Sequence, residues 1–101
     1  MESKTLSQLQ EYYKQKAKER GFDKETPQDV LLFMTEELGE LARAIRKNLG
    51  LMIDNKEKIY AIEEELADLL NYLLHMSNVL GLNLEEAYWK KEAENETRKW
   101  K

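Results

Sequence analysis

The sequence contains no cysteine and few of the residues that interrupt helices. One proline and four glycines are spread over 101 residues, and runs of β-branched residues are few, so helices can extend with few breaks. The lack of cysteine excludes disulfide bonds and thiolate metal ligands. It also fits a reducing compartment, for which we expect the cytoplasm. These absences favour an all-α protein.

Two further absences concern membranes and nucleic acids. No apolar run is long enough to span a bilayer and the N-terminal residues are polar, so we expect neither a membrane span nor a signal peptide. Acidic residues outnumber basic ones by 20 to 16, which gives a net charge of −4. Nonspecific DNA binding needs clustered Lys and Arg that displace counterions, so we expect no nucleic-acid partner.

Helical periodicity and capping signals predict four helices within one domain that spans residues 1–101. Thr26 followed by Pro27 is typical of a helix start, and Asn83 with Glu86 three residues later resembles a capping box. A domain this small buries a thin core, which oligomerisation would supplement. The predicted helices cover residues 5–20, 26–47, 57–80 and 83 to near the C-terminus, with a loop or irregular turn over 49–56.

Two acidic pairs occupy helix positions where apolar residues are expected. Glu37 and Glu40 form one pair, and Glu65 and Asp68 form the other; residues three apart share a helix face. At about 100° per residue, Glu37 and Glu65 are each centred on an apolar stripe that spans roughly 40° to either side. These stripes contain Val30, Phe33, Leu41 and Ala44 around Glu37, and Ala61, Leu69, Tyr72, Met76 and Val79 around Glu65.

A divalent cation would explain why carboxylates lie on apolar faces. An unpaired carboxylate in a core is costly or becomes protonated, and two of them on neighbouring helices also repel. Carboxylate oxygens suit hard ions, Mg²⁺ first and Mn²⁺ as a substitute. We therefore predict a Mg²⁺ site built from Glu37, Glu40, Glu65 and Asp68. Solvated surface charge is the alternative interpretation, and it would be the better one for a single Glu-x-x-Glu pair.

The acidic residues also form a pattern that resembles a known family. Residues 36–40 read EELGE and residues 65–68 read ELAD, which resembles the EExxE…ExxD signature of MazG-like nucleotide pyrophosphohydrolases in the all-α NTP pyrophosphatase superfamily. The resemblance covers about residues 26–100. It implies a four-helix MazG-like protomer whose bundle is completed by oligomerisation to a homodimer or homotetramer. It also implies Mg²⁺-dependent hydrolysis of an NTP or dNTP to the monophosphate and pyrophosphate.

The resemblance assigns roles by motif position. Glu37, Glu40, Glu65 and Asp68 become the Mg²⁺ ligands. Glu36 becomes either the base that orients the attacking water or a residue that supports the ligands.

The last predicted helix carries Lys91, Asn95 and Arg98 on one face, within roughly 40° of Lys91. The family has a similar Lys…Asn…Arg run that contacts substrate phosphates, so the resemblance implies a substrate-binding role for these three residues. Basic residues near a helix C-terminus are favourable in any case because of the helix macrodipole, and a purely structural role stays open.

Two residues after the second acidic pair allow more than one interpretation. Asn71 lies one turn after Asp68, so it could orient that carboxylate or bind the substrate. His75 shares a helix flank with both residues. We interpret His75 as a surface histidine at a subunit contact, with a role at the metal site as the alternative.

Three other functions fit parts of the pattern. A di-iron carboxylate bundle needs Glu-x-x-His pairs, and here Tyr72 stands three residues before His75. A non-enzymatic helical module that binds nucleotides or proteins would explain the amphipathic helices but not the acids at core positions. A member of the family that binds nucleotides without turnover would explain both.

Overall fold

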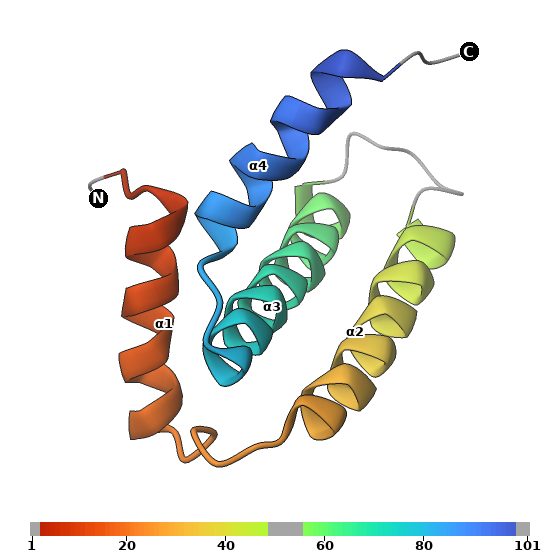
Figure 1. Cartoon of the computed structure of the whole chain (residues 1–101). Coiled ribbons are helices and arrows are strands. Elements are labelled where there is room, and N and C mark those ends of the chain that lie inside the picture. Colours follow the sequence, from red (N-terminus) through yellow and green to blue (C-terminus); the bar gives the residue numbers. More distant parts are fainter. Residues whose placement is uncertain (1–2, 49–55, 99–101) are drawn as a thin grey trace.

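The computed structural model describes residues 3–48 and 56–98, which form helices and no strand (Figure 1). The all-α prediction is confirmed, and so are the four predicted helices. The predicted loop over 49–56 lies outside the described residues except for its last position. The helices are α1 (Leu6–Glu19), α2 (Pro27–Asn48), α3 (Lys56–Leu80) and α4 (Leu84–Thr97).

Side-chain caps fix the starts of α2 and α4 where the sequence predicted them. Thr26 Oγ1 accepts from the Asp29 backbone N–H and Asp29 Oδ2 accepts from the Thr26 backbone N–H, each at 3.1 Å. Asn83 Oδ1 accepts from the Glu86 backbone N–H at 2.9 Å. These bonds satisfy N–H groups that have no partner within the first helical turn.

The end of α1 determines how the chain turns towards α2. Gly21 has a φ of 83°, a left-handed conformation that glycine adopts without steric cost. The Gly21 N–H donates to Lys18 O at 3.2 Å and the Phe22 N–H donates to Ala17 O at 2.7 Å, which is the Schellman pattern of helix termination. The Glu25 N–H donates to Phe22 O at 3.1 Å, so Phe22 and Glu25 have fixed backbone positions between the two helices.

The third helix, α3, is the centre of the arrangement. It lies between α1 and α2 and runs antiparallel to α2 (Figure 1). Its contact with α2 is the most extensive in the described chain, while α4 packs chiefly against α1. The acidic pairs of α2 and α3 are therefore carried by two helices that lie side by side.

The core is thin, as the size of the chain predicted. Tyr13 and Ala17 of α1 pack against Leu74 of α3, and Val30 and Leu41 are the buried hydrophobic residues of α2. The last two belong to the apolar stripe predicted around Glu37, which is confirmed at these positions.

On α3 the apolar stripe predicted around Glu65 is only partly buried. The buried side chains among the described residues of α3 are Leu74, His75 and Ser77. The reason is that α3 packs against α1 as well as α2, so its most buried side lies away from the stripe that carries Glu65. In the described part of the chain, no helix has the length and apolar character needed to cross a membrane. The cytoplasmic location stays a prediction.

Candidate metal centre

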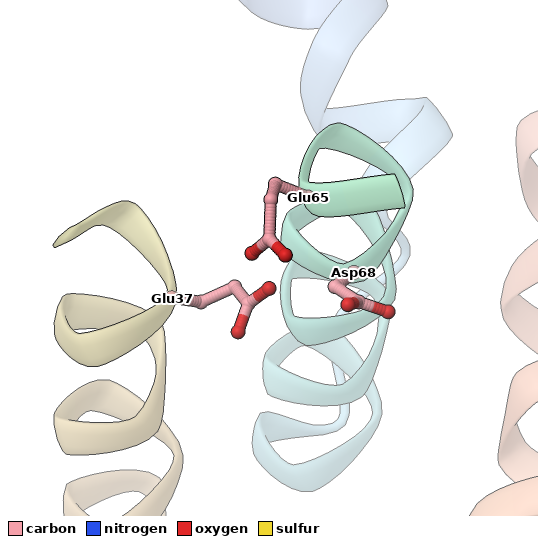
Figure 2. A group of neighbouring side chains, drawn as sticks. All are labelled: Glu37, Glu65 and Asp68. Carbon is pink, nitrogen blue, oxygen red and sulfur yellow. The ribbon is translucent and has the colours of Figure 1, made fainter. Parts of the chain in front are cut away.

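Three of the four predicted metal ligands converge between α2 and α3. Glu37 projects from α2 towards Glu65 and Asp68 of α3 (Figure 2). One carboxylate oxygen from each residue lies within 4.8 Å of the other two. The arrangement follows from the sequence because Glu65 and Asp68 are three residues apart on one side of α3, and Glu37 is on the side of α2 that faces it.

Two oxygens of this cluster are buried and have no hydrogen-bond partner. They are Glu37 Oε1 and Glu65 Oε2, while Asp68 is more exposed. A buried acceptor without a partner is costly, and such atoms are uncommon in folded proteins unless an ion or water satisfies them. Three carboxylates are the ligands that Mg²⁺ and Mn²⁺ prefer, so the residues fit a hard divalent cation.

The same crowding changes the acidity of Glu37. Burial raises its pKa to about 7, and the neighbouring carboxyl groups of Glu65 and then Asp68 act in the same direction. Without a cation, the three carboxyl groups are therefore not all ionised near neutral pH, because part of the Glu37 population keeps its proton. A divalent cation would reverse this effect, because an opposite charge favours the ionised form.

The carboxylates lie at an open cleft of about 740 Å³. Glu36 and Glu40 line this cleft beside Glu37, but neither belongs to the group of three converging carboxylates. The predicted roles of Glu36 as the catalytic residue and of Glu40 as a ligand stay predictions.

Two arginines that the sequence analysis did not single out also line the cleft. Arg43 and Arg46 follow Glu40 at intervals of three residues along α2. This spacing keeps both arginines near the acidic side of the helix. The sequence pattern could therefore have identified them as residues of the site. The cleft therefore combines carboxylates, which bind cations, with guanidinium groups, which bind phosphate oxygens.

The residues predicted to bind phosphate on α4 lie elsewhere. None of the described residues that line the cleft comes from α4. Lys91 Nζ pairs with Glu94 Oε1 at 3.5 Å, Asn95 Oδ1 is buried without a partner, and the Arg98 backbone N–H caps the helix by donating to Asn95 O. Their substrate-binding role stays a prediction.

A second hollow adjoins the carboxylates on the side of α1. Asn71, Tyr72, Tyr13 and Phe22 line a cavity of about 260 Å³ that also reaches Glu37 and Asp68. Asn71 is thus placed beside the cluster, as its position after Asp68 predicted, although its role is untested. Burial and then the charge of Glu37 raise the pKa of the Tyr72 hydroxyl, which keeps that hydroxyl protonated as a hydrogen-bond donor.

His75 is not the surface residue that we predicted. Its side chain is 4% exposed, and its Nε2 lies 3.0 Å from Glu25 Oε1. The Tyr13 ring meets the imidazole edge to face with 5.8 Å between centroids. The prediction failed because Glu25 approaches from the link between α1 and α2, fifty residues away in the sequence, and helical periodicity carries no information on such a contact.

Comparisons with known proteins show the family of the chain. The sequence profile of the MazG nucleotide pyrophosphohydrolase domain matches residues 25–99, a range that includes the three converging carboxylates. The chain is also 35% identical over 92 residues to the uncharacterized protein YpjD of Bacillus subtilis (strain 168), an alignment that covers 87% of this chain and 80% of that protein. Since the profile spans most of the chain, including the helices that carry the carboxylates, this protein belongs to the MazG nucleotide pyrophosphohydrolase domain family.

Proposed function

We propose that the protein is a Mg²⁺-dependent nucleotide pyrophosphohydrolase that converts an NTP or dNTP and water to the monophosphate and pyrophosphate. The observation that carries the proposal is the convergence of Glu37, Glu65 and Asp68 at the cleft. Membership of the family supports the class of reaction.

Glu37, Glu65 and Asp68 would hold the Mg²⁺, with Mn²⁺ as a substitute and Glu40 as a further ligand at the edge of the cleft. When bound, the ion would neutralise part of the polyphosphate charge and activate water for attack. The fit rests on the two buried, unpartnered carboxylate oxygens and on the all-oxygen ligand set.

The other side chains of the cleft suggest how the substrate is held. Arg43 and Arg46 line the same hollow as the carboxylates, and arginine binds phosphate oxygens in a bidentate manner. Negative charge grows on these oxygens as the phosphoanhydride bond breaks, so fixed cations would stabilise the transition state. Glu36, which lines the cleft and is exposed, would accept a proton from the attacking water.

A homo-oligomer completes the proposal. The described helices expose large apolar side chains at intervals of seven residues on both α2 and α3, a pattern typical of a seam between packed helices. With so few buried hydrophobic residues in the protomer, a second copy would bury this surface. The proposed oligomer is a homodimer or a homotetramer. The stripes consist of Leu31, Leu38 and Ile45 on α2 and Leu66, Leu73 and Leu80 on α3.

A hydrolysis assay tests the activity. The purified protein is incubated with a panel of NTPs and dNTPs, with Mg²⁺ or with EDTA, and both pyrophosphate and monophosphate are measured. We expect Mg²⁺-dependent release in equal amounts. Glu65→Gln and Asp68→Asn should lower the rate roughly 100-fold or more, because even residues that only support metal ligands contribute about 10- to 100-fold.

Glu64→Gln is the matched control, since Glu64 is exposed and lies outside the cluster; it should retain the wild-type rate. If the folded protein binds nucleotides but releases no pyrophosphate from any of them, the enzymatic proposal is wrong. The non-enzymatic nucleotide-binding module is then the better account.

A further inference from the structure

A recess walled by aromatic side chains lies next to the carboxylates. We call the two adjoining cavities, of about 260 Å³ and 180 Å³, the aromatic recess. Tyr13, Phe22 and Tyr72 line both cavities, so the cavities share a wall. The larger one reaches Glu37 and Asp68, and the smaller one ends at Glu25 and His75.

The polar side chains at the inner end of the recess are paired with each other. The Glu25 carboxylate can only accept, so the proton in its 3.0 Å contact belongs to His75 Nε2. His75 Nδ1 is buried, whereas the Glu25 side chain is 24% exposed and lines the recess, so the Glu25 carboxylate is the acceptor that a ligand can reach. A carboxylate only accepts hydrogen bonds, and it suits a ligand that brings N–H groups.

We propose that the aromatic recess binds the nucleobase of the substrate and that the His75–Glu25 pair recognises its exocyclic amino group. This inference rests on the proposed function for the phosphate side of the nucleotide. Glu37 and Asp68 line both the cleft and the larger cavity of the recess, so a nucleotide bound at the carboxylates would have its base near the recess. Aromatic rings provide stacking surfaces for any base. Cytosine and adenine carry an amino group at the ring position where uracil, thymine and guanine present a carbonyl oxygen. The recess therefore selects cytosine and adenine.

The first test uses the fact that His75 is the single histidine of the chain. Its imidazole gives one set of NMR signals, which are followed while CMP, UMP or ribose 5-phosphate is added to the full-length protein. CMP and UMP differ in the group at one ring position, an amino group in CMP and a carbonyl in UMP. We expect CMP to shift the His75 signals at concentrations roughly 10-fold lower than UMP, and ribose 5-phosphate to leave them unchanged.

A kinetic test with matched variants examines the aromatic wall. Phe22 and Tyr12 are both substantially exposed, at 39% and 50%, but only Phe22 lines the recess. Phe22→Ala should lower kcat/KM for CTP by roughly 10-fold or more, mainly through KM, because a base–aromatic stack is lost. Tyr12→Ala should leave it unchanged. Ribose 5-triphosphate has no base, so neither variant should affect its hydrolysis.

Glu25→Gln tests the polar end and keeps an acceptor for His75 Nε2, because the amide oxygen can take the place of the carboxylate oxygen in the 3.0 Å contact. The amide introduces a donor that can pair with a carbonyl of uracil. The ratio of kcat/KM for CTP to that for UTP should therefore fall towards or below one. If the contact between Glu25 and His75 only supports the fold, kcat/KM should fall equally for CTP, UTP and ribose 5-triphosphate. That outcome overturns the inference.

The two proposals fail in different ways. If nucleotides are hydrolysed but no base shifts the His75 signals and Phe22→Ala behaves like Tyr12→Ala, the base-binding inference is wrong and the proposed function stands. If CMP shifts the His75 signals while no triphosphate is hydrolysed, the proposed function is wrong and the recess is still a base-binding site.

Discussion

Replacing Glu37 with glutamine should stabilise the metal-free protein at pH 8 and remove its response to Mg²⁺. Burial, helped by Glu65 and Asp68, raises the pKa of Glu37 from its ordinary 4.5 to about 7. A group whose pKa is higher in the folded than in the unfolded protein favours folding below the unfolded value. That contribution is lost as the pH rises from about 4.5 through about 7. At pH 8 the ionised side chain therefore destabilises the metal-free fold, and an amide does not.

The size of the effect follows from the same pKa change. At about 1.4 kcal/mol per pKa unit, the rise from 4.5 to about 7 sets an upper bound of about 3.5 kcal/mol on the ionisation cost. Glu37 is only partly buried, so solvent screening reduces this to roughly 1–2 kcal/mol. For a domain of this size, that corresponds to an increase in Tm of roughly 5–10 °C.

Thermal unfolding in EDTA at pH 5 and pH 8 measures the effect, at one fixed protein concentration. The Tm of Glu37→Gln should exceed that of wild type at pH 8, and the difference should be much smaller at pH 5. Glu64→Gln should leave the Tm unchanged at both pH values. Adding Mg²⁺ at about 100 times its Kd should stabilise wild type by about 2.7 kcal/mol and leave Glu37→Gln unaffected. An equal effect of the Glu37 substitution at both pH values would refute the electrostatic reasoning.

Three further substitutions test the packing and the surface. Leu74→Ala removes a side chain that is 2% exposed in the core, so the free energy of unfolding should fall by about 2–5 kcal/mol in denaturant titrations. Thr26→Ala deletes the acceptor for the Asp29 N–H and should cost about 1 kcal/mol; Thr35→Ala, within the same helix, is the comparison. Leu73→Lys places a charge in the exposed stripe of α3, and sedimentation velocity should show monomers where wild type forms oligomers; unchanged sedimentation would contradict the proposed seam.

The helices and the metal cluster could be predicted from the sequence because both depend on local spacing. Thr26 and Asn83 start helices through bonds that span three residues. The facing positions of Glu37 and Glu65 follow from helical periodicity once α2 and α3 are neighbours. These features need no information about distant parts of the chain.

The rest of the site depends on contacts that spacing does not encode. The Glu25–His75 pair joins residues fifty positions apart. The position of α4, and with it that of Lys91, depends on packing against α1, and helical periodicity does not specify which helices pack together. Arg43 and Arg46 were overlooked because exposed arginines on a helix are common, and only the shape of the cleft distinguishes them.

Gly21, the left-handed residue at the end of α1, should affect both the folding of the protein and its nucleotide preference. A Cβ built on Gly21 would meet no atom within 4 Å, so no neighbouring side chain requires glycine there. Its backbone conformation, however, determines the direction in which Phe22 leaves the helix. Any side chain at this position would strain the turn and move one wall of the recess. Variation at a residue that touches no substrate would then alter nucleotide preference as well as folding, and homologues with other residues at this position should differ in both.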